Sequence, residues 1–207
     1  MTNSFTIAVF CGSSAGDDPV YLREAYRVGT ILADRGIGLV YGGGHVGLMG
    51  AVADGVMEGG GTATGVIPHQ LQSREESNYD ITELIVVDSM HERKAIMAER
   101  SDAFLALPGG PGTLEEITEQ WTWAQLGIHQ KPCGVLNIDG YYDPLAALVA
   151  NMRDHRFTHP RFTEILAIDS DIDVLLDRFL SYVPPLQHHL SPGQELAGDT
   201  AEPPVEP

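Results

Sequence analysis

The chain has 207 residues, a formal net charge of −17 and 23 glycines. This length suits one domain with a single core. The strong negative charge argues against a protein that binds by neutralising many phosphates of a nucleic acid. A small anion can still bind, because backbone amides and one or two arginines hold it through short contacts. We therefore expect a small-molecule partner and no nucleic acid.

The cysteine content and the N-terminus bear on the compartment. Cys11 and Cys133 lie far apart in apolar segments and form no CxxC or Cys/His cluster, so disulfide-rich export and structural zinc are both disfavoured. Residues 1–10 lack a basic region followed by a long apolar stretch, and no window approaches 18 uninterrupted apolar residues. We expect a cytoplasmic protein that binds no membrane and no metal.

Apolar runs alternate with amphipathic segments along most of the chain. Strands are expected at 6–11, 38–41, 62–67, 84–87, 103–107, 133–137 and 165–168. Helices are expected at 19–35, 47–58, 90–100, 113–126, 144–155 and 172–181. This alternation predicts an α/β fold of three layers, with a mostly parallel central sheet between two layers of helices.

Capping residues support three of the helix starts. Pro19 follows Asp18, and both Ser89 and Thr113 are followed three residues later by a glutamate. From Pro184 onward the chain holds six prolines, four acidic residues and no lysine or arginine. We expect one folded domain over residues 1–183 and a disordered Pro-rich acidic tail over 184–207.

Three glycine-rich loops follow expected strands. They are CGSS at 11–14, YGGGHVG at 41–47 and PGGPGT at 108–113. In open parallel sheets, ligands bind beyond the carboxyl ends of the strands, where loops present amides and helix N-termini carry partial positive charge. These loops are therefore the expected binding edge, although glycines can also serve only tight turns and close packing.

The second loop contains a formal GxGxxG at Gly42, Gly44 and Gly47. A dinucleotide site also needs an acidic residue at the end of the next strand, and that strand here ends at Ile67 and Pro68. The motif also follows the second expected strand and not the first. An NAD-dependent oxidoreductase is therefore the poorer interpretation.

The third loop combines three glycines with a hydroxyl at a helix start. Gly109, Gly110, Gly112 and Thr113 can bring several amides and one Oγ1 to a single point, which fits a phosphate group. Thr113 could instead only cap its helix by accepting from the amide of Glu116. That alternative does not explain the glycines, so we favour phosphate binding.

Charged residues lie in the first turns of two expected helices. Because both helices begin at the same edge of the sheet, Arg93 and Glu116 can face each other across one cavity. Glu75 lies in the long loop after the third expected strand and could fold over that cavity. Each residue also has a structural alternative. Glu116 could only be the capping partner of Thr113, and Arg93 could be an ordinary surface cation. Glu92 is interpreted as the capping partner of Ser89.

The sequence PGGPGTLEE at 108–116 resembles the PGGxGTxxE signature of the LONELY GUY (LOG) family of cytokinin riboside 5'-monophosphate phosphoribohydrolases. The same order and spacing are found in FCGSS at 10–14, YGGGHVGLMG at 41–50, GVIP at 65–68, MHERK at 90–94 and WAQLGIHQKP at 123–132. The resemblance covers residues 6–183, and the loop 72–80 matches only loosely.

This resemblance implies a Rossmann-like homodimer with active sites near the subunit interface, no cofactor, and Arg93 and Glu116 at the catalytic positions. The residues expected to bind the nucleotide are Gly12, Ser13, Gly43, Gly44, Glu75, Met90, Arg93, Lys94, Gly109, Gly110, Gly112, Thr113, Leu114 and Glu115. The main alternative is a carrier that binds a nucleotide or a phosphorylated cofactor without hydrolysis. Proteins of this type have been labelled lysine decarboxylases, but no recognisable pyridoxal-phosphate lysine site is present.

Overall fold

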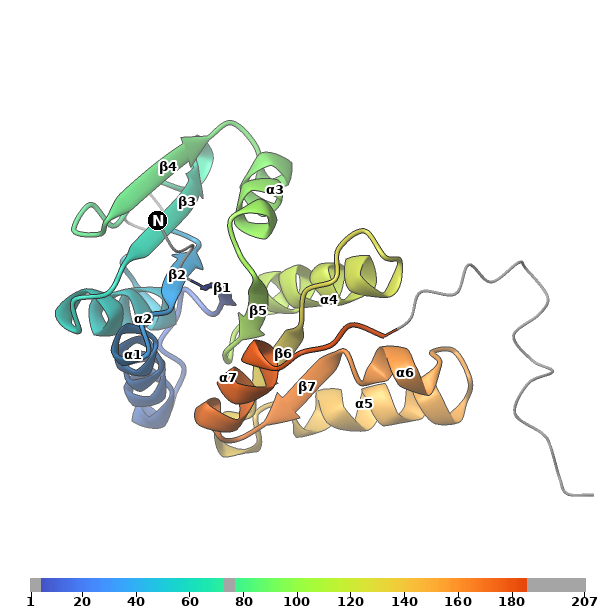
Figure 1. The fold of residues 1–207 in the computed structure, drawn as a ribbon. Coiled ribbons are helices and arrows are strands. Elements are labelled where there is room, and N and C mark those ends of the chain that lie inside the picture. Colours follow the sequence, from blue (N-terminus) through green and yellow to red (C-terminus); the bar gives the residue numbers. More distant parts are fainter. Residues whose placement is uncertain (1–4, 73–76, 186–207) are drawn as a thin grey trace, which may run out of the picture.

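The computed structural model describes residues 5–72 and 77–185 and contains one seven-stranded sheet (Figure 1). Every ladder between neighbouring strands is parallel, and the strand order is β4-β3-β2-β1-β5-β6-β7. The strands are β1 (Thr6–Phe10), β2 (Gly38–Tyr41), β3 (Ala63–Pro68), β4 (Glu83–Val87), β5 (Ala103–Ala106), β6 (Cys133–Leu136) and β7 (Leu166–Asp169).

Helices connect most of the strands. They are α1 (Pro19–Asp34), α2 (Gly47–Glu58), α3 (Met90–Glu99), α4 (Pro111–Gln125), α5 (Asp143–Asp154), α6 (Pro160–Thr163) and α7 (Ile172–Leu180). Two short 3₁₀ turns, η1 (His69–Leu71) and η2 (Ile138–Gly140), follow β3 and β6. The six expected helices and seven expected strands are all present, with ends that differ by at most two residues. The short α6 was not expected.

The sheet separates two apolar cores. Along β1, Ile7 and Val9 pack with α1, α2 and α7, whereas Ala8 and Phe10 pack with α3, α4 and α5 on the opposite face. Successive side chains of a strand point to opposite faces, so a strand covered on both sides must be apolar at every position. The predicted three-layer α/β fold with a parallel sheet is confirmed.

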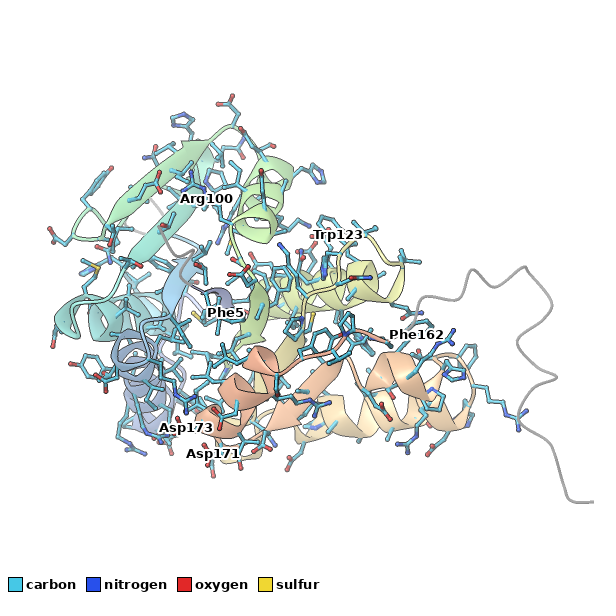
Figure 2. All side chains as sticks on the ribbon, in the orientation of Figure 1. Phe5, Arg100, Trp123, Phe162, Asp171 and Asp173 are labelled. Carbon is cyan, nitrogen blue, oxygen red and sulfur yellow. The ribbon has the colours of Figure 1, made fainter. Side chains whose placement is uncertain are left out.

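Ion pairs at the surface connect helices of one layer. Arg35, just after α1, forms ion pairs with Asp173 and Asp177 on α7. Figure 2 shows Asp173 on α7. Within the described residues, no helix is long and apolar enough to cross a membrane. The predicted tail lies outside the described residues from position 186 onward.

Two of the three predicted helix starts are confirmed. The carboxylate of Asp18 accepts from the amide of Val20, and Ser89 Oγ accepts from the amide of Glu92. The expected start at Thr113 is wrong, because α4 begins two residues earlier, at Pro111. Proline is favoured at the first helical position, since its missing N–H and fixed φ suit that place.

The strand order makes β1 the point at which the connections diverge. From β1 the chain proceeds to β2 and β3 on one side, then returns from β4 to β5 on the other side of β1. At such a switch point the loops after the two neighbouring strands separate and leave a crevice at the carboxyl edge. The loops after β1 and β5 are therefore the natural place for a ligand.

Candidate functional site

A pocket of about 350 Å³ lies at this switch point. The loop after β1 and the loop after β5 form two of its walls, and Tyr21 and Tyr141 form part of the remainder. Gly12 donates its amide to the carbonyl of Pro108 at 3.0 Å, which holds the two loops against each other. Two glycine loops predicted to bind the same ligand therefore share one cavity.

The loop after β5 packs closely against the first turn of α4. A Cβ atom added at Gly109 would lie 2.2 Å from Thr113 Oγ1 and 2.8 Å from the amide nitrogen of Gly12. Only glycine fits this position without displacing a neighbour. Thr113 is buried, so its hydroxyl is held where the two loops meet.

The N-terminus of α4 has the features of an anion-binding site. Gly110 is the N-cap and makes no side-chain capping bond, and Pro111 is the first helical residue. Amides in the first turn of a helix, here those of Gly112 and Thr113, have no carbonyl partner within the helix, and the helix dipole adds positive potential. This arrangement suits a phosphate group.

Arg93 on α3 and Glu116 on α4 lie next to each other. Their exposed fractions are 5% and 8%, and 3.9 Å separates Arg93 Nη2 from Glu116 Oε1. This separation permits strong attraction at a buried site but exceeds hydrogen-bond distance for these two atoms. Glu116 lies one helical turn beyond Thr113, so the carboxylate is close to the amide-lined end of α4.

The guanidinium group of Arg93 lies over a glycine of the loop after β2. A Cβ atom added at Gly42 would be 2.2 Å from Arg93 Nη2 and 2.9 Å from Met49 Sδ. From the sequence, Gly42 was expected only as part of the glycine loop at 41–47 and its weak dinucleotide motif, with no role of its own. Its structural role is to leave space for the arginine that faces Glu116.

Lys94 joins the two helices that carry this pair. Its Nζ lies 2.5 Å from a carboxylate oxygen of Glu115 and 2.9 Å from one of Glu119. Partial burial lowers the pKa of Lys94, but the two hydrogen bonds outweigh burial, and the pKa is raised overall. Lys94 is therefore a charged link between α3 and α4, and it fixes their relative position.

The other predicted binding residues lie on the loops after β1 and β2 and in the first turns of α3 and α4. Gly43 and Gly44 are buried; the carbonyl of Gly43 accepts from the amide of Asn78, and Gly44 pairs with Ser77 in an isolated bridge. Ser13, Met90 and Leu114 are exposed. Glu75 lies outside the described residues.

Sequence reasoning missed Tyr141 and Tyr142, whose hydroxyls both reach the loop after β5. They follow β6 at the same edge of the sheet as the glycine loops. The rule that ligands lie beyond the carboxyl ends of strands could have identified them. Glu92, interpreted as a capping residue, accepts at 2.9 Å from the amide of Asp88, next to the N-cap Ser89.

The fold and this cavity define a Rossmann-like α/β protein with a glycine loop at a helix N-terminus and a neighbouring carboxylate and guanidinium. A family model described as "Possible lysine decarboxylase" matches residues 49–179. A probable cytokinin riboside 5'-monophosphate phosphoribohydrolase of Oryza sativa subsp. japonica (LOGL1) is 58% identical over 142 residues, which are 69% of this chain and 64% of that protein. The cytokinin riboside 5'-monophosphate phosphoribohydrolase LOG7 of Arabidopsis thaliana is 48% identical over 178 residues, covering 86% and 82%. The chain belongs to the LOG family.

Solved structures show the same fold. The molybdenum cofactor binding protein of Rippkaea orientalis superimposes with a TM-score of 0.65 at 24% identity, covering 87% of this chain and 98% of that one. The molybdenum cofactor carrier protein of Chlamydomonas reinhardtii gives a TM-score of 0.65 at 21% identity, covering 86% and 99%. At these identities the likeness concerns the fold alone.

The lysines of this chain do not suit the decarboxylase chemistry in the family description. A lysine that forms a Schiff base must lose its proton readily. Of the two lysines, Lys94 has a raised pKa because of its carboxylate partners. Burial lowers the pKa of Lys131, but this lysine precedes β6 at the amino edge of the sheet, away from the pocket, and its Nζ donates to the carbonyl of Ala98. Neither offers a reactive amine at the glycine-loop pocket.

Proposed function

We propose that this protein is a phosphoribohydrolase that cleaves the N-glycosidic bond of a purine nucleoside 5'-monophosphate, of adenosine or of a cytokinin type. Water is consumed, and the products are the free base and ribose 5-phosphate. The observation that carries this proposal is the buried pair of Arg93 and Glu116, one helical turn from an amide-lined helix N-terminus. The curated relatives named as phosphoribohydrolases support it.

The pair suits the charges that develop during this reaction. As the bond from C1' to the purine nitrogen breaks, its electrons leave with the base and positive charge builds on the ribose. The carboxylate of Glu116 stabilises that charge and accepts a proton from the attacking water. Arg93 positions Glu116 and offsets the negative charge on the departing purine, which then takes up a proton.

The loop after β5 supplies the phosphate site in this scheme. Gly110, Gly112 and Thr113 bind the phosphate, while Gly12 and Ser13 form the opposite wall. Binding energy from this remote group holds the sugar at the correct distance from Glu116. We assign Gly43, Gly44, Met90, Lys94, Leu114 and Glu115, together with Glu75, to the surroundings of the nucleoside.

Replacement of Glu116 by Gln tests the assignment. The variant keeps the shape of the side chain but removes the charge and the proton acceptor, so kcat for base release from AMP should fall by about 10²- to 10⁴-fold. Chromatography of free adenine measures this loss. The matched control is Glu83→Gln, because Glu83 is an exposed glutamate on β4 whose ion pair with Arg100 lies outside the pocket.

Nucleotide binding separates the proposed enzyme from a carrier. Glu116→Gln should still bind AMP with a Kd within a fewfold of the wild type, because the phosphate contacts are retained. Near-normal turnover by this variant would remove Glu116 from the chemistry. Tight AMP binding by a wild-type protein that releases no base from any purine nucleoside monophosphate would support the carrier instead.

We also infer a cytoplasmic homodimer with its active sites near the subunit interface. Leu126 and Ile128, just beyond α4, are 65% and 64% exposed, and Trp123 on the same helix is partly exposed. Large apolar side chains gathered at the end of a helix that carries active-site residues suit a contact with a second subunit. The free, buried thiols of Cys11 and Cys133 suit a reducing compartment.

A further inference from the structure

Two adjacent tyrosines at the carboxyl end of β6 hold the loop that follows β5. The hydroxyl of Tyr142 donates to the carbonyl of Leu107 at 2.7 Å. The hydroxyl of Tyr141 donates to the carbonyl of Gly109 at 2.5 Å. The carbonyl of Pro108, between these two, accepts from the amide of Gly12. Three successive carbonyl groups of this loop are therefore fixed from outside it.

The segment between β6 and α5 is built to present these hydroxyls. Asp139 and Gly140 both have positive φ, of 51° and 73°, which turns the chain sharply. Asn137 secures the turn at both ends, because its Oδ1 accepts from the amide of Tyr142 and its Nδ2 donates to Asp143, each at 2.7 Å. The position of the two rings is therefore set by the turn and not by the ligand.

The two tyrosines differ in their surroundings. Tyr142 is buried in the core beneath the sheet edge, so its hydroxyl is part of the packing of the domain. Tyr141 is 41% exposed, lines the pocket, and meets the ring of Tyr21 edge-on with 5.9 Å between centroids. Because Tyr141 is partly exposed, its hydrogen bond to the backbone contributes less to folding than the hydrogen bond of the buried Tyr142.

The bond from Tyr141 determines the direction of an amide. The peptide that joins Gly109 to Gly110 is planar and trans, so its C=O and N–H point in opposite directions. A carbonyl held by the Tyr141 hydroxyl therefore fixes the N–H of Gly110, which points away from that hydroxyl, and Gly110 itself lines the same pocket. Glycine has the widest freedom of rotation of any residue, so an unrestrained peptide between two glycines would sample many directions.

We propose that Tyr141 is a positioning residue for phosphate binding. Its hydroxyl orients the peptide between Gly109 and Gly110 so that the amide of Gly110 is ready for the phosphate group of the substrate before the substrate arrives. The role rests on the proposed function, since it assigns the phosphate of a nucleoside monophosphate to this pocket. Orientation before binding lowers the entropy cost of ordering the loop and so strengthens affinity.

The substitution Tyr141→Phe, made in the full-length protein, removes the hydroxyl and keeps the ring against Tyr21. The matched control is Tyr26→Phe, which removes a hydroxyl that donates at 2.7 Å to Glu58 between α1 and α2, away from the pocket. For each protein, kcat and KM are measured with AMP, and Kd with ribose 5-phosphate by calorimetry. Thermal unfolding provides Tm.

For Tyr141→Phe we expect KM for AMP and Kd for ribose 5-phosphate to rise by about 3- to 10-fold, the range for loss of one neutral hydrogen bond. We expect kcat to change by less than about twofold, because Glu116 and Arg93 are unaffected. Tyr26→Phe should leave all three constants unchanged. A merely structural role for Tyr141 would lower Tm without this separation of KM from kcat.

The inference is overturned if Tyr141→Phe retains the wild-type Kd for ribose 5-phosphate, or if kcat falls while KM does not change. Should the wild-type protein release no base from AMP or from isopentenyladenosine 5'-monophosphate, the proposed function fails on its own. The Kd values for ribose 5-phosphate then still decide the role of Tyr141, since they need no turnover.

Discussion

Arg93 shows how a single buried charge depends on its neighbours. An isolated guanidinium at 5% exposure would be costly, because removal of a charge from water costs several kcal/mol. Glu116 at 3.9 Å offsets part of that cost. The absence of a side chain at Gly42 provides the space in which the guanidinium lies. The position of the arginine therefore depends on α4 and on the loop after β2, as well as on its own helix.

This dependence gives a prediction for Gly42→Ala. The new methyl group would lie 2.2 Å from Arg93 Nη2, so the flexible end of that side chain must move, and it moves relative to Glu116. We expect kcat/KM for AMP to fall by about 10- to 100-fold, because small displacements of catalytic groups carry large kinetic costs. We expect Tm to change by only a few degrees.

A comparison with Arg93→Ala tests the explanation. If Gly42→Ala acts by displacing the guanidinium, the double variant should be no less active than Arg93→Ala alone, because the two substitutions remove the same interaction. Additive losses in the double variant would assign Gly42 a role independent of Arg93.

At the scale of elements, the loop after β5 and the first turn of α4 form one unit. Gly109 packs against Thr113 and the loop after β1, whereas a Cβ added at Gly112 meets nothing within 4 Å. The two glycines lie in one motif, yet their requirements differ. At Gly109 glycine is needed for packing, and at Gly112 it keeps the approach to the helix N-terminus open.

Alanine at each position should separate these requirements. Gly109→Ala places a methyl group against backbone and a buried hydroxyl, so we expect the free energy of unfolding to fall by about 2 kcal/mol or more. Gly112→Ala should leave stability within about 0.5 kcal/mol of the wild type and raise KM for AMP. Chemical denaturation and steady-state kinetics measure both effects, and similar stability losses for the two variants would contradict this distinction.

The helices and strands could be predicted well from the sequence, because the periodicity of apolar residues reflects which positions are buried. β1 is apolar from Ile7 to Phe10 since both of its faces are covered, and the alternation of strands and helices then leaves few arrangements. The start of α4 was misplaced because Thr113 has the pattern of a capping residue. Gly110 is the N-cap, which the three glycines of PGGPGT do not reveal.

Contacts between distant loops were harder to predict. Arg93 and Glu116 were expected to face each other, because both begin helices at one edge of the sheet, and the structure brings them together. The bond from Tyr141 to Gly109 joins loops 32 residues apart, and no periodic pattern encodes it. Such a contact depends on the exact path of a turn that contains two residues with positive φ.

At the scale of the whole molecule, the charge of −17 must coexist with the binding of an anion and with the proposed association of two copies. The amides at the end of α4 and the guanidinium of Arg93 act over a few ångströms, while distant carboxylates are screened over about 10 Å at 0.1 M salt. Two copies of a strongly acidic chain repel each other as a whole. An apolar contact adds no further like-charge repulsion, and the exposed side chains of Leu126 and Ile128 beyond α4 suit such a contact.

This reasoning predicts that Leu126→Asp combined with Ile128→Asp converts a dimer into a monomer. Both side chains are about two-thirds exposed in the single chain, so the aspartates cost little in the fold but place four like charges in a symmetric contact. Light scattering after gel filtration measures the mass. Val174→Asp on α7 is the matched control, because it replaces an exposed apolar residue of the opposite helical layer and should leave the mass unchanged. A wild-type protein that is monomeric at micromolar concentration would contradict the dimer, and a doubly substituted protein that stays dimeric would place the contact elsewhere. If the active sites lie near this interface, the monomeric variant should also lose AMP hydrolysis while Val174→Asp retains it.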